Sequence, residues 1–231
     1  MPFTFDFGPV AARSDVILDG VWQTLYLSGV GILLGLGLGV LLAMSRGLIP
    51  RPVQRLLDAY IEVIRNTPFL IQLFLIFFGL PVLGLRLNAM QAAIVTIMLN
   101  LGAYATEIIR AGIDNIHPSQ IEAGASLALT RLQVFRHVVL MPALARVWPS
   151  LTSQFVLTLL GTSICSFISV QELSGSAAQV ESETFRSFET YIVVTVVYLV
   201  LSLLLRLALL GVGEVLFPRG SGLRRLMGSQ R

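Results

Sequence analysis

Residues 117–130 read HPSQIEAGASLALT, a polar segment of small side chains in the middle of a chain whose other long stretches are apolar. The 231 residues have a mean hydropathy of +0.81, with 55% hydrophobic and only 13% charged residues. Charged residues usually make up about a quarter of a soluble domain. The composition therefore predicts a membrane protein, and it leaves the purpose of residues 117–130 to be explained.

Five windows are apolar over about the 20 residues that an α-helix needs to cross the hydrocarbon core of a membrane. They are residues 21–44, 66–85, 87–106, 147–170 and 190–213. Arg206 interrupts the last window, but it lies towards one end, where a long side chain reaches the headgroups. The sequence predicts an all-α membrane protein with five transmembrane helices in a single domain, residues 1–231.

Arginines gather in the segments that follow the first, third and fifth windows. They are Arg46, Arg51 and Arg55; Arg110, Arg131, Arg136 and Arg146; and Arg219, Arg224, Arg225 and Arg231. The segments on the opposite side are acidic or nearly neutral. Because positive charge marks cytoplasmic loops, we expect an extracytoplasmic N-terminus and a cytoplasmic C-terminus. Residues 110–146 then form a large cytoplasmic loop, which contains the opening segment.

This loop is predicted to form two short helices. Ser119 and Glu122 match a capping box, so a helix should begin at Ser119. Thr130 and Gln133 repeat the pattern and should open a second helix, which Pro142 should end. The first helix carries small side chains and two large apolar contacts, Leu127 and Leu129. The small residues are Ala123, Gly124, Ala125, Ser126 and Ala128. Such a corner fits either a partner's groove or a simple cap on the helix bundle.

Four segments resemble the permease subunits of ABC importers, in the subfamily for polar amino acids such as histidine, arginine and glutamine. They are YIEVIRNTPFLIQLFLIFFGLP (60–81), LNLGAYATEIIRAGI (99–113), HPSQIEAG (117–124) and GTSICS (161–166). With the weaker likeness of the first window, the resemblance covers all but the tails. It implies the fold of a type I ABC importer permease, in which residues 110–146 carry the helix that couples to the ATPase.

The resemblance also implies partners and a place in the cell. We expect a bacterial cytoplasmic (inner) membrane protein that pairs with a second permease subunit, identical or paralogous. Two cytoplasmic ATPase subunits and an extracytoplasmic solute-binding protein would complete the importer. ATP and magnesium would be bound by the ATPase, and no cofactor by this chain. All 16 basic residues are arginines, so the lysine of a phosphate-binding loop is missing from this sequence.

The coupling helix would sit in a groove of the ATPase, with Glu122 and Ala123 in the positions that name the Glu-Ala-Ala loop of these permeases. The chain departs from the family pattern at four positions. Ala128 replaces a usual glycine, Met141 a usual proline, and Leu160 and Gly161 a frequent Lys-Asp pair. These departures affect the expected shape of the coupling turn and any role of the charged pair in packing or gating.

Polar residues at helical spacing predict where a substrate would pass. They are Gln154, Thr158, Thr162 and Ser166 in the fourth window, and Asn100, Tyr104 and Glu107 in the third. Lipid offers no hydrogen-bond partner, so these faces should meet protein or water. Each residue alone fits hydrogen bonding between helices, whereas the fourth-window stripe together with the resemblance favours a translocation path. Gln154 is the first candidate for a ligand contact, and Arg110 is a possible ion-pair partner of Glu107.

Two features of the windows predict geometry. Pro68 lies near the start of the second window, where it favours either a kink that could serve as a gating hinge or an ordinary helix start. Glycines of the first window have spacings that predict close packing against a neighbouring helix. They are Gly29, Gly31, Gly35, Gly37 and Gly39.

Three other functions compete with an importer permease. An ion-coupled carrier should show an internal repeat and intramembrane acids in matching halves, and this sequence shows one off-centre acid, Glu107. An intramembrane enzyme needs a catalytic constellation, and neither a catalytic motif nor a second ligand at metal-site spacing accompanies His117 or His137. A scaffold partner that makes no substrate contact in a heteromeric permease stays open. The sequence favours a transport subunit whose ATP is hydrolysed by another chain.

Overall fold

The computed structural model describes residues 5–45 and 49–217, and within these ranges the regular structure is entirely helical. The helices are α1 (Gly8–Ala11), α2 (Ser14–Ser45), α3 (Arg51–Arg65), α4 (Phe69–Phe74), η1 (Leu75–Gly79), η2 (Leu80–Leu83), α5 (Ala89–Asp114), α6 (Pro118–Ser126), α7 (Arg131–Gln133), η3 (Val134–Leu140), α8 (Met141–Gly161), η4 (Thr162–Ile168), α9 (Leu173–Thr184) and α10 (Ser187–Leu216). The predicted all-α class is confirmed. Five arginines used for orientation lie outside the described residues: Arg46, Arg219, Arg224, Arg225 and Arg231.

Four helices in the described ranges are long and apolar enough to cross a membrane. They are α2, α5, the continuous helix Val134–Ile168, and α10. A fifth span arises if α3 and Phe69–Leu83 are counted together, although they are bent by 113° at a short break. The predicted second window, 66–85, contains this break. The prediction of five spans therefore depends on whether the bent pair crosses the membrane as one unit.

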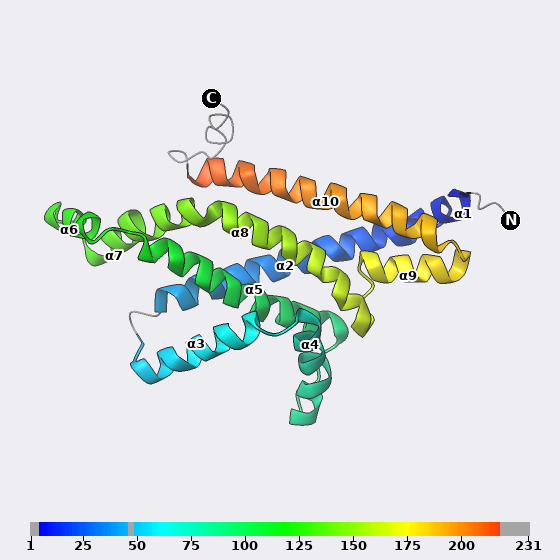
Figure 1. The fold of residues 1–231 in the computed structure, drawn as a ribbon, viewed down its shortest axis with the longest axis horizontal. Helices are drawn as coiled ribbons and strands as arrows, with labels where there is room; N and C mark the ends of the chain where they lie inside the picture. Colours follow the sequence, from blue (N-terminus) through cyan, green and yellow to red (C-terminus); the bar gives the residue numbers. More distant parts are fainter. Residues whose placement is uncertain (1–4, 46–48, 218–231) are drawn as a thin grey trace.

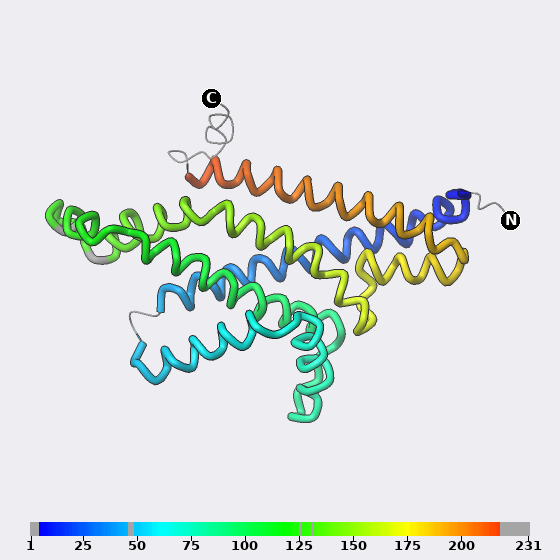
Figure 2. Tube along the Cα trace, viewed as in Figure 1, coloured from blue at the N-terminus to red at the C-terminus, as the bar shows by residue number. Residues whose placement is uncertain are grey.

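The long helices lie side by side along the longest axis of the molecule (Figures 1 and 2). α5 packs most extensively against α2 and also contacts α8, while α8 contacts α10. The indole nitrogen of Trp148 on α8 donates to the carbonyl of Leu209 on α10 at 2.9 Å. α6 and α7 lie at one end of the bundle, α1 and α9 at the other, and α3 runs beside α5. The coupling-loop helices are thus held at one end of α5 and α8.

Small side chains allow α2 and α5 to approach closely. Three of the four buried glycines of α2 lie directly against a side chain of α5: Gly31 against Ile97, Gly35 against Leu101, and Gly39 against Ala105. A Cβ at any of the three would collide with that neighbour. The predicted packing role is confirmed for these three. Gly29 and Gly37 lie on the other face of the helix with open space beside them, so they do not pack against another helix in the described part of this chain.

Pro142 does not end the second loop helix, so that prediction is wrong. It lies in the first turn of α8, and the helix runs unbroken from Val134 to Ile168. The preceding residues, Val134–Leu140, form a π-helical stretch. Its wider turn moves the upstream carbonyls away from the place where a proline ring would clash with them.

Candidate functional site

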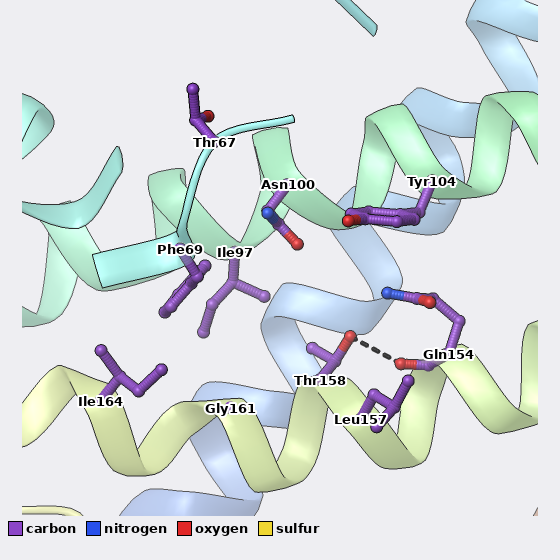
Figure 3. Close-up of a pocket in the computed structure, with 10 residues that line it drawn as sticks. All are labelled: Thr67, Phe69, Ile97, Asn100, Tyr104, Gln154, Leu157, Thr158, Gly161 and Ile164. Carbon is purple, nitrogen blue, oxygen red and sulfur yellow. Dashed lines mark hydrogen bonds between the residues drawn. The ribbon is translucent and has the colours of Figure 1, made fainter. Parts of the chain in front are cut away.

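A cavity of 240 Å³ lies where the start of α4 meets α5 and α8. α5 contributes Asn100 and Tyr104, and α8 contributes Gln154 and Thr158 from the opposite side (Figure 3). Four residues predicted for the substrate path therefore meet in one place, which we call the pocket. All the described residues that line it are uncharged.

The amide of Gln154 is the polar group best placed to meet a ligand. Its side chain points across the pocket towards the ring of Tyr104 (Figure 3). Within the described part of the chain, its amide neither donates nor accepts a hydrogen bond. The hydroxyl of Thr158, by contrast, donates to the backbone carbonyl of Gln154 at 2.9 Å. Gln154 thus keeps a donor and an acceptor available, whereas the Thr158 proton is already used inside the helix.

Gln72 positions Asn100 and braces the break between α3 and α4. It is 5% exposed, and its Oε1 accepts from Asn100 Nδ2 at 2.9 Å. Its Nε2 donates to the carbonyls of Ile64 at 2.7 Å and Thr67 at 3.0 Å. Gln72 was not predicted from the sequence, because a lone glutamine in an apolar window carries no periodic signal. Nor were Thr67 and Phe69, which the helix break brings to the pocket.

Pro68 lies at the centre of this break. Its backbone is extended, with φ −63° and ψ 138°, and α4 begins at the next residue. Pro68 therefore separates two helices and does not kink one continuous helix. A hinge at this position stays a prediction.

Thr162 and Ser166 do not reach the pocket. The helix tightens to 3₁₀ geometry from Thr162 to Ile168, so spacings of four no longer keep residues on one face. Thr162 is fully buried, and its hydroxyl donates to the carbonyl of Leu159 at 2.7 Å. Ser166 lines a different cavity, of 450 Å³, beside α9.

Glu107 lies in a second cavity, of 490 Å³, between α3 and α5. Its carboxylate pairs with Arg110 at 3.2 Å, as the sequence predicted, and with Arg65 of α3 at 3.9 Å. Tyr104 lines both this cavity and the pocket. The two cavities are therefore neighbours along α5, one uncharged and the other charged.

The first helix predicted in the cytoplasmic loop is present as α6, Pro118–Ser126, and its coupling to an ATPase stays a prediction. It begins one residue earlier than expected, so the prediction that Ser119 caps it is wrong. The ring of His117 takes that place, because its Nδ1 lies 3.3 Å from the backbone nitrogen of Ser119 and 2.7 Å from its hydroxyl. The capping box at Thr130 and Gln133 is confirmed, with reciprocal bonds of 2.8 and 3.3 Å.

One face of α6 is exposed and the other packs on the following helix. Glu122, Ala123 and Leu127 are exposed, Leu127 by 75%. Gly124 is buried, and a Cβ there would lie 3.2 Å from Val134. The side chain of Ala125 lies outside the described part of the structure. The exposed face therefore contains fewer residues than were predicted to contact the ATPase, because Gly124 faces the following helix.

The turn after α6 ends in a left-handed residue, Ala128, with φ 56°. The amide of Leu129 donates to the carbonyl of Gly124 at 3.3 Å, which closes the helix in a Schellman motif. This geometry favours glycine, and it explains why the resembled permeases carry one where this chain has Ala128.

Residues 35–213, more than half of the chain, match the family model of the binding-protein-dependent transport system inner membrane component. The chain belongs to this family. It is therefore a membrane permease subunit, and a separate ATPase hydrolyses the ATP. The prediction of a transport permease subunit is confirmed.

Two relatives and one solved structure place the permease among amino acid ABC transporters. The glutamine transport system permease protein GlnP of Escherichia coli K12 is 35% identical over 203 residues, covering 87% of this chain and 93% of its own. The probable glutamine ABC transporter permease protein GlnM of Bacillus subtilis 168 is 37% identical over 186 residues, covering 80% and 86%. The crystal structure of an amino acid ABC transporter with histidines matches with a TM-score of 0.81 and 33% identity, covering 90% and 97%. The resemblance to amino acid permeases, and with it the permease fold, is confirmed.

Proposed function

We propose that this permease imports a neutral polar amino acid of the glutamine type through the pocket, driven by an ATPase that docks on α6. The observation that carries the proposal is the pairing of an unoccupied amide, Gln154, with Asn100 and Tyr104 in a cavity without charged lining residues. The names of the two relatives, both glutamine permeases, support the same substrate class.

A neutral substrate side chain fits this pocket better than a charged one. A charged group that leaves water loses its hydration, and the described lining offers it no opposite charge. An amide, by contrast, can exchange a donor and an acceptor with the Gln154 side chain. Gly161 supports the same choice, since it lines the pocket with open space where the resembled permeases often place part of a charged pair.

The proposed assembly has this chain beside a second permease subunit, with two ATPases on the α6 side and a solute-binding protein on the α9 side. The arginine-rich loop that contains α6 supports a cytoplasmic position for it. The N-terminus would then be extracytoplasmic and the C-terminus cytoplasmic. Glu122, Ala123 and Leu127 would enter the groove of the ATPase, because they form the exposed face of α6.

The test is ATP hydrolysis by the permease reconstituted in lipid with its ATPase and binding protein, across a panel of amino acids. We expect stimulation by L-glutamine and other neutral polar amino acids. Gln154→Leu should raise the concentration for half-maximal stimulation about tenfold, because the amide's hydrogen bonds to the substrate are lost. The adjacent exposed residue supplies a control, Ser153→Leu, which makes the same polar-to-leucine change outside the pocket.

The outcomes separate this function from its alternative. A flat response across the panel, with the complex intact, would show that the substrate class is wrong. Stimulation that is equal in wild type and in Gln154→Leu would instead favour a scaffold subunit, whose partner permease contacts the substrate. Selective loss in Gln154→Leu, with assembly unchanged, supports the path through this chain.

A further inference from the structure

We propose that the charged cavity between α3 and α5 is a second amino acid site, which receives the zwitterion after it leaves the pocket. This cavity, the vestibule, is defined by its charged lining residues: Asp58, Glu62, Arg65, Glu107 and Arg110. The proposal rests on the proposed function and adds a step to it. The pocket would recognise the side chain of the amino acid, and the vestibule its α-carboxylate and α-ammonium groups.

The vestibule lies directly after the pocket along α5. Tyr104 separates it from the pocket and lines both. The hydroxyl of Tyr104 lies 3.4 Å from the carbonyl of Arg65, and the Arg65 guanidinium lies 5.6 Å from the Tyr104 ring centre. One aromatic side chain and one arginine thus form the boundary between the two cavities. A rotation of Tyr104 would connect them.

The charges of the vestibule match a zwitterion and disfavour simple ions. Its lining holds three carboxylates and two guanidinium groups. A free anion would meet the carboxylates, and a free cation would meet the guanidinium groups, so each is repelled by part of the lining. An amino acid carries both charges on adjacent atoms. It can therefore present its carboxylate to Arg65 or Arg110 and its ammonium group to Glu62.

The existing ion pairs are open to competition. Arg110 pairs with Glu107 at 3.2 Å and with Asp114 at 3.7 Å, while Arg65 lies 3.9 Å from Glu107. The side chains of Arg110 and Arg65 are 30% and 41% exposed. Ion pairs that solvent reaches contribute little to stability, so a substrate carboxylate can replace one at low cost. The existing ion pairs therefore hold the two guanidinium groups in place and still allow them to bind a substrate carboxylate.

The vestibule also lies towards the end of the bundle that carries α6. Along α5 the order is Tyr104, Glu107, Arg110 and Asp114, and α6 begins four residues later at Pro118. In the orientation proposed above, this end faces the cytoplasm. Occupation of the vestibule would therefore come before release, next to the helix on which the ATPase acts.

The experiment measures whether an amino acid protects a thiol placed in the vestibule. Asn66 lines the cavity and is exposed, so Asn66→Cys introduces a reactive group there. The native Cys165 is fully buried, and the unmodified permease reports its background. The rate of maleimide labelling is followed in the lipid-reconstituted permease–ATPase complex without binding protein, over a range of L-glutamine concentrations.

We expect L-glutamine to slow labelling of Asn66→Cys, both alone and in combination with Gln154→Leu, because the vestibule binds independently of the pocket. Adding Glu62→Gln should raise the protecting concentration at least about tenfold, since a charge-assisted contact to the ammonium group is lost. The matched control is Glu214→Gln, the same change at an exposed position of α10. It should leave protection as it was.

Three results would overturn the proposal, and they can be told apart. Unchanged labelling in a complex whose ATP hydrolysis responds to L-glutamine refutes the vestibule site and leaves the proposed function standing. Protection that Gln154→Leu abolishes as fully as Glu62→Gln means one shared site in place of two. Absence of any response to amino acids, in hydrolysis and in labelling, refutes the function and the vestibule together.

Discussion

Ala128 has a left-handed backbone conformation, which is unfavourable for alanine. Its φ of 56° costs an alanine about 1–2 kcal/mol that a glycine does not bear. We expect Ala128→Gly to stabilise the loop by up to about 1 kcal/mol, since the greater freedom of glycine in the unfolded chain offsets part of the gain. Limited proteolysis between α6 and α7, in the purified permease, measures this.

The control for Ala128→Gly is the same exchange inside the helix, Ala123→Gly. There glycine costs about 1 kcal/mol, so cleavage should become faster. If both variants accelerate cleavage equally, the left-handed conformation at position 128 is not what limits the stability of this turn.

Single residues of the site were predictable where helical spacing decided their direction. Asn100, Tyr104, Gln154 and Thr158 follow α-helical spacing on two helices, and the structure brings them into one cavity. The spacing failed for Ser166 because the helix is 3₁₀ from Thr162 to Ile168, and nothing in the local sequence predicts this change. The role of Gln72 could not be predicted for another reason. Its hydrogen-bond partners come together only when the break between α3 and α4 folds against α5.

The contact between α2 and α5 depends on the absence of side chains, and this can be tested at one position. A Cβ at Gly35 would lie 2.8 Å from the Cβ of Leu101, which is 1% exposed and cannot move aside freely. Gly35→Ala should therefore destabilise the permease by about 1–3 kcal/mol, the usual cost of overpacking. Thermal unfolding in detergent measures the loss.

Gly37→Ala is its matched control on the same helix. A Cβ there meets open space, and alanine has the higher helix propensity, so the variant should unfold at or slightly above the wild-type temperature. Equal losses in both variants would show that helix geometry, and not contact with α5, sets the requirement for glycine.

The start of α9 depends on a buried carboxylate, Glu172. It is fully buried, and its oxygens accept from the backbone amides of Ser174 and Gly175 at 3.0 Å and from the Tyr198 hydroxyl at 2.5 Å. Burial raises its pKa above the ordinary value of 4.5, although these hydrogen bonds oppose the rise. Folding therefore favours the protonated form of Glu172.

This shift fixes the sign of a pH effect on stability. The folded state binds the Glu172 proton more tightly than the unfolded state, so its contribution is complete below pH 4.5 and is lost as pH rises through the folded pKa. We expect the unfolding temperature to fall over that window in wild type. Glu172→Gln should flatten the fall, because the amide oxygen still accepts hydrogen bonds but cannot ionise.

The pKa of Glu181 shifts in the opposite direction to that of Glu172. Glu181 is partly exposed, and hydrogen bonds from Ser187 and Tyr191 lower its pKa. Glu181→Gln should therefore leave the slope above pH 4.5 intact and act only on the acid side. A slope that survives in Glu172→Gln would mean that another group titrates.

At the scale of elements, the long helices were predictable and their interruptions were not. Apolar length located α2, α5, α8 and α10, because a membrane span must satisfy its backbone within one helix. The bend of 113° before α4 and the continuation of α8 through Pro142 depend on local geometry that tertiary contacts stabilise. The stop predicted at Pro142 was wrong, whereas of the two readings of Pro68, a kink or a helix start, the structure shows a helix that begins at the next residue.

For the whole molecule, docking on α6 should be separable from folding. Ala123 lies on the exposed face, so Ala123→Trp should leave the unfolding temperature of the isolated permease unchanged. The added ring blocks close approach of the ATPase, so we expect at least about a tenfold loss in its affinity. Co-purification and ATP hydrolysis in reconstituted complexes measure this. If Ala123→Trp binds wild-type amounts of ATPase and uptake is normal, α6 does not dock the ATPase and only caps the helix bundle.

The unbroken α5 joins the pocket to the corner at α6, and this continuity imposes a thermodynamic symmetry. If docking of the ATPase changes the affinity of the pocket by some factor, occupation of the pocket must change the affinity for the ATPase by the same factor. Arg146 holds that corner, since its guanidinium donates to the carbonyl of Asn115 at 3.0 Å. On the proposed function, the amino acid would then change the affinity for the ATPase by the same factor by which the ATPase changes the affinity for the amino acid.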